Sequence, residues 1–186
     1  MRAVRRLRRE EGGFTLPELL VAMMLMLTAM FALYSIFDMS LRIFSFGNDR
    51  TEAVEQARAG LERMDRELTA AHPYDRAGGD ETLLPSYGPE HISFGNDLDG
   101  SRKVAPGEEI IYELNGSTLM RNGLPMVEFV DDLSFEYLDA SGAAATGESD
   151  IAMVRITLDI EVRRGPWAGT QTLSTEVALR NRTDRG

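Results

Sequence analysis

Residues 12–20 read GGFTLPELL, and they lead into an apolar run, residues 19–37, that reads LLVAMMLMLTAMFALYSIF. The apolar run has 19 residues and no charge. As an α-helix that rises 1.5 Å per residue it is roughly 28 Å long, which is about the thickness of the hydrocarbon core of a bilayer. The sequence therefore predicts one membrane-spanning helix near the N-terminus.

The segment before the apolar run is basic. Residues 1–13 contain five arginines and two glutamates, a charge of +3, whereas the whole chain of 186 residues carries −10. Because basic flanks of a membrane helix stay in the cytoplasm, we expect the rest of the chain to lie outside the cytoplasmic membrane. A cleaved secretory signal is the alternative, but it needs small residues at −3 and −1, and residues 27–40 hold no such pair. We therefore expect the apolar helix to remain in the mature protein.

Glu18 places a carboxylate at the mouth of the apolar run. A glutamate toward the middle of a bilayer costs about 2.5–3.5 kcal/mol on insertion scales, so such a residue suggests a function and a partner. A structural interpretation is also available, because Thr15 and Glu18 have the spacing of a capping box and Pro17 is tolerated in a first helical turn. The two interpretations can hold together.

Residues 13–18 (GFTLPE), with a basic leader before them and an apolar helix after them, resemble the class III signal of type IV pilins and pseudopilins. The resemblance implies that a prepilin peptidase cleaves between Gly13 and Phe14 and that the new N-terminal Phe14 is methylated. Glu18 is then the fifth mature residue. On a helix Phe14 and Glu18 share a face, so the carboxylate could pair with the ammonium of its own chain or of a neighbouring subunit. Pro17 departs from the aliphatic residue that the family more often has.

Beyond the membrane segment, apolar residues recur at spacings of three and four. They are Val54, Ala57, Leu61, Met64, Leu68 and Ala71. This stripe predicts that the helix runs from about Phe14 to Ala71, ends before Pro73, and has a possible break at Gly47-Asn48 and a weaker one at Gly60. The stripe is short for a coiled coil and favours packing against the protein's own sheet.

The chain after Pro73 changes its period from 3.6 to 2. Residues 109–114 and 117–121 flank Asn115-Gly116, a strong hairpin signal, and residues 152–163 alternate strictly between apolar and polar. We expect loops at residues 73–90 and 141–149. The fold class is therefore α+β, with a long N-terminal helix on an antiparallel sheet of about four to six strands. Its segments are a leader (1–13), a membrane and assembly helix (14–37), an amphipathic continuation (38–72) and a β domain (73–186).

A second resemblance is carried by the C-terminal half. Residues 175–181 (TEVALRN), together with Tyr112 and residues 119–121, are similar to the minor pilins and minor pseudopilins of the pilus-tip complex. Trp167 lies between them in a Gly/Pro-rich turn. It could cover one end of the core, or it could anchor a partner if it is exposed.

Metal and cofactor chemistry find little support in the sequence. There is no cysteine, and the two histidines, His72 and His91, stand 19 positions apart. Asp97 and Asp99 lie in a stretch similar to part of a calcium loop, but the position for the twelfth ligand is Pro106, so an acidic turn is favoured. No nucleophile elbow or phosphate loop is present. We expect no cofactor and no enzymatic activity.

The function that we expect is that of a minor pilin-like subunit of a filament. Its partners are prepilin peptidase, other major and minor pilins or pseudopilins, an inner-membrane assembly platform, and the membrane before assembly. An adhesin or DNA-uptake subunit is the alternative, and a membrane-tethered enzyme is a weaker one. Residues 14–150 total −15 and residues 151–186 total +2, which gives DNA binding little electrostatic help. The sequence leaves open whether the machine is a type IV pilus, a type II secretion pseudopilus or a competence pilus.

Overall fold

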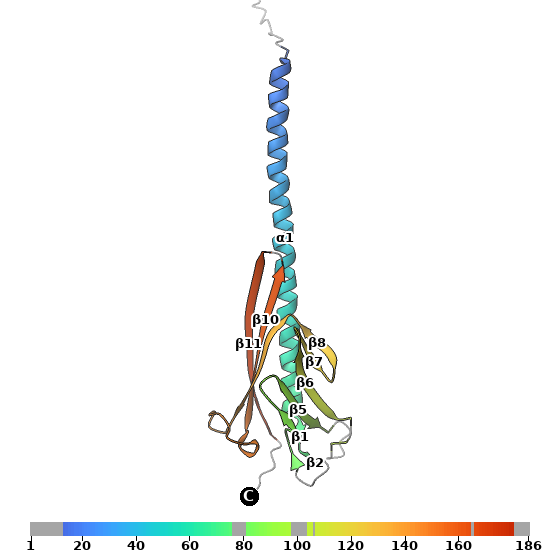
Figure 1. Ribbon diagram of the computed structural model, residues 1–186, viewed down its shortest axis with the longest axis vertical. Helices are drawn as coiled ribbons and strands as arrows, with labels where there is room; N and C mark the ends of the chain where they lie inside the picture. The colour runs from blue at the N-terminus through green and yellow to red at the C-terminus, as the bar shows by residue number, and fades with distance from the viewer. Residues whose placement is uncertain (1–12, 76–80, 98–103, 106, 165, 181–186) are drawn as a thin grey trace, which may run out of the picture. The chain divides into compact units, whose positions relative to one another are not determined.

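The structure is a computed structural model that describes residues 13–75, 81–97, 104–105, 107–164 and 166–180. In these residues the chain forms one long helix, α1, followed by strands and a short 3-10 turn, η1 (Glu148–Asp150) (Figure 1). The chain divides into two compact units, the first ending at Ser45 and the second beginning at Phe46. The expected α+β class is confirmed.

Helix α1 (Leu16–Thr69) has 54 residues. It starts and ends within two residues of the predicted limits. The predicted breaks at Gly47-Asn48 and Gly60 are wrong, because the helix continues through both. A glycine inside a helix costs only about 1 kcal/mol relative to alanine, and the carbonyl of Gly47 accepts a bond from the Thr51 hydroxyl at 2.9 Å.

The strands of the second unit are short at first and long at the end. They are β1 (Ala71–His72), β2 (Tyr74–Asp75), β3 (Glu81–Thr82), β4 (Ser86–Tyr87), β5 (His91–Asn96), β6 (Glu109–Asn115), β7 (Thr118–Arg121), β8 (Leu124–Glu128), β9 (Val130–Leu138), β10 (Met153–Arg164) and β11 (Trp167–Ala178). The region expected to be a loop, residues 73–90, thus holds three two-residue strands in its described part. One of them, β4, belongs to the six-stranded sheet, and the other two pair with each other.

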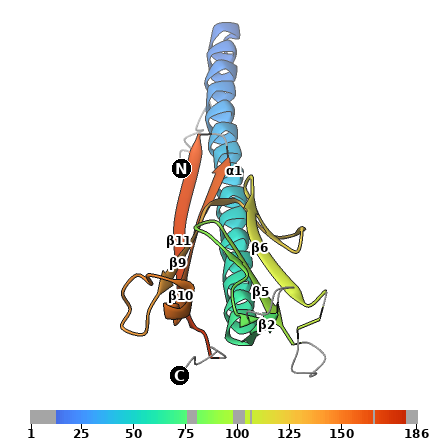
Figure 2. The same cartoon turned by 60° about the horizontal axis from the view of Figure 1, so that its bottom comes forward.

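The strands form two main antiparallel sheets. One has six strands in the order β1-β5-β6-β7-β8, with β4 also paired to β5, and the other has the order β11-β10-β9. The hairpin predicted at Asn115-Gly116 joins β6 to β7 as expected. In Figure 2 the two sheets are seen on different sides of the last part of α1.

The single sheet that the sequence predicts is divided at Phe129. This residue has φ = 63°, in the left-handed region that a bulky side chain rarely occupies. It lies between the end of β8 and the start of β9, and its carbonyl accepts the amide of Glu161 on β10 at 2.9 Å. The chain therefore leaves the six-stranded sheet at this residue and enters the three-stranded one.

One hydrophobic core joins the last part of α1 to both sheets. The strict alternation predicted for β10 is confirmed, since Val154, Ile156, Leu158, Ile160 and Val162 are all buried. The helical stripe is partly different from the prediction. Ala53 and Gly60 are buried, whereas Val54 is only half-buried.

Gly60 lies close against β8, with no room for a side chain. A Cβ atom added there would lie 2.6 Å from Cγ2 of Val127 on β8. Valine has a stiff χ1 and cannot move its methyl group away cheaply. At Gly47, in contrast, no atom lies within 4 Å of an added Cβ.

The two helical glycines should respond oppositely to the same substitution. Gly60→Ala should lower the free energy of unfolding by about 1–2 kcal/mol, because overpacking outweighs the gain in helix propensity. Gly47→Ala, the matched control, should raise it by up to about 1 kcal/mol. Urea unfolding of the full chain in detergent measures both. An increase in stability for Gly60→Ala would contradict the close contact.

Candidate functional site

The processing junction precedes the first turn of α1. Gly13, Phe14 and Thr15 are not helical, and the side chain of Phe14 is 77 % exposed. Residues 1–12 of the leader lie outside the described residues. The Gly13–Phe14 peptide bond therefore stands in accessible, non-helical backbone, which is the form in which a peptidase can bind it.

Thr15 and Glu18 take the positions that the capping interpretation requires. The carbonyl of Thr15 accepts the amide of Leu19 at 3.1 Å, so Thr15 is the residue just before the first helical one. Glu18 is the third helical residue and is exposed. An acid in the first turn is stabilised by the positive end of the helix dipole. The carboxylate is thus held at the membrane-entry end of α1 with its side chain accessible.

The helix face expected to be common to Phe14 and Glu18 is not formed in this unprocessed chain. Helix α1 begins at Leu16, so Phe14 lies two residues outside it. Pairing between the Phe14 amine and Glu18 within one chain would need the helix to extend by one half turn after cleavage. Pairing with a neighbouring subunit makes no such demand, and the roles of Gly13, Phe14 and Glu18 stay predictions.

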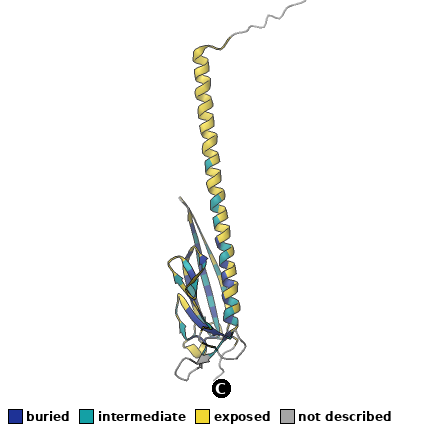
Figure 3. Cartoon of the chain, turned by 90° about the vertical axis from the view of Figure 1, so that its right-hand side faces the viewer, coloured by how far each residue is buried: buried dark blue, intermediate teal, exposed yellow. Residues whose placement is uncertain are grey.

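The first unit exposes a continuous apolar surface. Helix α1 contains a segment that is long and apolar enough to cross a membrane, and 0 % of that segment is buried. Figure 3 shows the same contrast along α1, exposed over its first part and buried in places over its last. The exposed large side chains continue past the predicted end at Phe37 as far as Phe44.

Five polar side chains in and just after this segment are bonded within the helix itself. The hydroxyls of Thr28, Ser35 and Ser40 donate to carbonyls one turn earlier, at 2.8–3.1 Å. Asp38 and Arg42 form an ion pair at 2.8 Å. Because hydrocarbon offers no hydrogen-bond partners, this internal pairing suits a helix that is surrounded by lipid or by other apolar helices.

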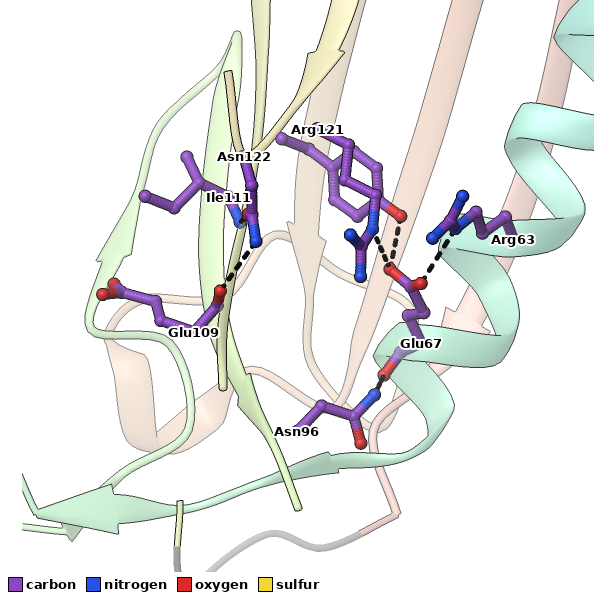
Figure 4. Close-up of polar contacts among 8 residues, drawn as sticks. Arg63, Glu67, Asn96, Glu109, Ile111, Arg121 and Asn122 are labelled. Atoms are coloured by element: carbon purple, nitrogen blue, oxygen red, sulfur yellow. Dashed lines mark hydrogen bonds and ion pairs between the residues drawn. The ribbon is translucent and has the colours of Figure 1, made fainter. Parts of the chain in front are cut away.

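The C-terminal end of α1 is bonded to the six-stranded sheet by a charged cluster around Glu67. Its carboxylate accepts bonds from Arg63 at 2.9 Å, Arg121 of β7 at 3.0 Å and the hydroxyl of Tyr112 of β6 at 2.5 Å (Figure 4). Its backbone carbonyl accepts the buried amide of Asn96 at 3.4 Å. Three strands are thereby tied to the last turn of the helix.

The turn after Arg121 is bonded to the neighbouring strand β6. Asn122 and Gly123 both have positive φ, as a tight hairpin turn between β7 and β8 requires. The side-chain amide of Asn122 donates to the carbonyl of Glu109 at 3.1 Å and accepts the amide of Ile111 at 2.7 Å (Figure 4). The turn is thus bound to β6, next to Tyr112.

The cluster changes the titration of its members. Although burial opposes ionisation of Glu67, the hydrogen bonds from Arg121, Tyr112 and Arg63 hold its pKa below the ordinary value. Burial and the neighbouring carboxylate raise the pKa of Tyr112. This cluster was not predicted from the sequence. The signal was that Tyr112 occupies an inward position on β6, where a hydroxyl needs a partner.

The two histidines and the described part of the calcium-like stretch do not form a common metal site. His91 lies beside Ser86, with Nε2 and Oγ 3.1 Å apart, and His72 is on β1. Asp99 and Pro106 of the calcium-like stretch lie outside the described residues. Among the residues that the structure describes, no group of three or more acidic or histidine side chains could hold a metal ion.

The N-terminal region matches a family model. Residues 8–34 match the prokaryotic N-terminal methylation motif. Among curated proteins, none matches the chain. The motif spans the basic end of the leader, the Gly13–Phe14 junction, Glu18 and most of the apolar run. The chain therefore carries a type IV pilin-like prepilin signal, and its helix-on-sheet layout is pilin-like.

The charged cluster should make part of the stability depend on pH. Since the pKa of Glu67 is lowered by folding, its contribution is present above the ordinary glutamate pKa of about 4.3 and is lost as the pH falls through the folded value. Glu67→Gln should therefore lower the free energy of unfolding at pH 7 by about 2 kcal/mol and weaken its fall toward pH 3.

Chemical unfolding between pH 3 and pH 7 measures this effect. Glu62→Gln, an exposed position on the same helix, is the control and should leave the pH dependence unchanged. Equal pH profiles for Glu67→Gln and the parent would show that the cluster does not stabilise the fold.

Proposed function

We propose that this protein is a minor pilin-like or pseudopilin structural subunit. A prepilin peptidase removes its leader, the membrane stores it, and an assembly platform moves it into a filament with other pilin-like subunits. One observation carries the proposal. A prepilin signal is joined directly to a helix whose apolar segment is 0 % buried, so the segment needs lipid first and other helices afterwards.

The membrane orientation follows from charge. The arginines of the leader favour a cytoplasmic N-terminus, with the second unit outside the cytoplasmic membrane. The scissile bond would then face a peptidase at the inner surface. The mature subunit would finish in a cell-surface pilus or in a periplasmic pseudopilus. Type IV pili, type II secretion and competence all use such subunits.

The subunit has no chemistry of its own in this proposal. Some charged groups of its second unit tie elements together, as Glu67 does at the end of α1. Arg155, in the middle of the three-stranded sheet, forms ion pairs with Glu136 and Glu176 on the two neighbouring strands. An arginine neutralised in this way adds little to binding of DNA phosphates.

A minor role is supported by charge and by the C-terminal resemblance. Without residues 1–13 the chain carries −13. Many stacked copies of such a domain would repel one another, although physiological salt screens charges beyond about 8 Å. A filament position among different neighbours avoids most of this repulsion.

Processing gives the first test of the proposal. Co-expression with an active prepilin peptidase should remove 13 residues and leave an N-methylated Phe14, as seen by intact mass and N-terminal sequencing. Gly13→Val should block the cut, because a side chain at this position obstructs the scissile bond, whereas Gly12→Val should not. A mature protein that begins after residue 30, or retains Met1, would overturn the proposal.

Glu18 gives the second test. Glu18→Gln keeps the shape of the side chain but removes the charge, so it should be inserted and cut as the parent is. It should enter filaments at least about tenfold less, because an unpaired ammonium at the membrane edge costs more than about 1.4 kcal/mol. Quantification in sheared filaments measures this, with Glu55→Gln as control. If Glu18→Gln assembles as the parent does, Glu18 acts only as a helix cap and the pairing with an ammonium group is wrong.

Abundance gives the third test. Sheared filaments analysed by quantitative mass spectrometry should contain this subunit far below the main one, at a ratio of at most about one to a hundred, because its acidic domain disfavours self-stacking. If it is the most abundant protein of the filament, the minor role is wrong and the processing prediction is unaffected.

A further inference from the structure

The structure describes four asparagines, which are Asn48, Asn96, Asn115 and Asn122. Glycine follows two of them, Asn115 and Asn122. Because glycine has no side chain to shield its backbone nitrogen, that nitrogen can approach the carboxamide carbon of the residue before it. An Asn-Gly pair therefore reacts with itself wherever the fold leaves the carboxamide free to turn.

Asn115 and Gly116 stand at the turn between β6 and β7. Asn115 pairs with Thr118, so Gly116 and Ser117 are the two central residues of the turn. Gly116 has φ = 63°, whereas Ser117 is not among the residues with positive φ, a pattern typical of a type II′ turn. Asn115 and both central residues are exposed. The turn thus presents an Asn-Gly pair to solvent.

Neither of the groups that would react at this turn is held by a hydrogen bond. Within the residues that the structure describes, the carboxamide of Asn115 has no hydrogen-bond partner, and the backbone nitrogen of Gly116 has none either. The next residue, Ser117, is bonded, since its carbonyl accepts the amide of Val130 at 3.0 Å. The side chain of Asn115 can therefore rotate toward the Gly116 nitrogen.

Asn122 is held firmly, although glycine follows it too. Its carboxamide donates to the carbonyl of Glu109 at 3.1 Å and accepts the amide of Ile111 at 2.7 Å (Figure 4). Both bonds have to break before the carboxamide carbon can approach the nitrogen of Gly123. The fold therefore protects this second Asn-Gly pair.

The other two asparagines are followed by aspartate and are also held by the fold. Asn96 is only 8 % exposed, and its side-chain amide donates to the carbonyl of Glu67 at 3.4 Å. Asn48 lies inside α1, where the helical hydrogen bonds engage the backbone nitrogen that follows it. Of the four described asparagines, only Asn115 combines a following glycine with an unbonded carboxamide.

We propose that Asn115 is a site of non-enzymatic deamidation in the folded protein. The nitrogen of Gly116 attacks Cγ of Asn115, and the bond from Cγ to the side-chain nitrogen breaks. The leaving nitrogen takes up the proton that Gly116 loses and departs as ammonia, which leaves a five-membered succinimide ring. Water then opens the ring at one of its two carbonyls and gives aspartate or isoaspartate. The reaction consumes only water and needs neither a membrane nor other subunits.

The two products change the turn in different ways. Both add a negative charge to the sheet face that carries the exposed Glu113, two residues earlier on β6. Isoaspartate also carries the main chain through Cβ, which lengthens the backbone just before Ser117. Because the Ser117 carbonyl is bonded to Val130 at the start of β9, isoaspartate weakens the connection between the two sheets. The modified fraction grows with time and so records the age of the folded subunit.

Trypsin separates the two Asn-Gly pairs, because it cleaves after Arg121. Residues 104–121 then contain Asn115, and residues 122–155 contain Asn122. The full-length chain in detergent is incubated at pH 8 in water enriched in oxygen-18, returned to ordinary water, digested, and analysed by mass spectrometry. Asn115 should take up oxygen-18 at least about tenfold faster than Asn122, which must first lose two hydrogen bonds. Fragmentation by electron transfer should show isoaspartate as well as aspartate at position 115.

Two controls separate the effect of the fold from that of the sequence. In guanidinium chloride the hydrogen bonds of Asn122 are lost, so the two Asn-Gly pairs should convert at similar rates. Asn115→Gln keeps an exposed carboxamide, but its longer side chain would have to close a six-membered ring, which forms far more slowly. This variant should therefore show no uptake of oxygen-18 in residues 104–121.

Two results would overturn the proposal. Equal conversion of Asn115 and Asn122 in the folded chain would show that the hydrogen bonds of Asn122 do not decide which pair reacts. Conversion of Asn115 in the denatured chain alone would show that the turn protects it. Neither result bears on processing, membrane anchoring or assembly, so the proposed function would stand in both cases.

Discussion

The main physical constraint on this protein is an apolar surface of helix α1 that the remainder of the chain does not cover. The membrane-length segment of α1 is 0 % buried, and the hydroxyls of Thr28 and Ser35 and the nearby Asp38–Arg42 pair are bonded inside the helix. Such a surface is stable in hydrocarbon or against other apolar helices, and not in water. A prepilin signal stands at the start of this surface, which agrees with the proposed use of the helix in both surroundings.

The second half of α1, in contrast, packs against strands of the same chain. Gly60 lets the helix approach β8 closely, and Glu67 ties its last turn to Tyr112 and Arg121. Removing one partner of this part-buried charged cluster leaves the other charges without compensation. The same helix therefore combines a segment whose apolar surface is uncovered by the chain with a segment whose buried face packs within the fold.

Local signals predicted most of the fold, and distant pairings accounted for what was missed. The ends of α1, the Asn115-Gly116 hairpin and the alternation of β10 each follow from a few neighbouring residues. The division into two sheets at Phe129 does not, because a left-handed aromatic residue has no sequence signal. The Glu67 cluster joins residues up to 54 positions apart, and only the inward position of Tyr112 pointed to it. The junction motif was recognised in full, while its function stays a proposal.

The most direct test of the account asks what surrounds the apolar segment before and after assembly. A photo-cross-linking amino acid placed at Leu27, an exposed position of that segment, should form adducts with lipid in cells that lack prepilin peptidase. In cells with the peptidase and an intact assembly platform, it should form adducts with the N-terminal helices of other pilin-like subunits, identified by mass spectrometry. Lipid adducts alone, unchanged by the peptidase, would contradict the account.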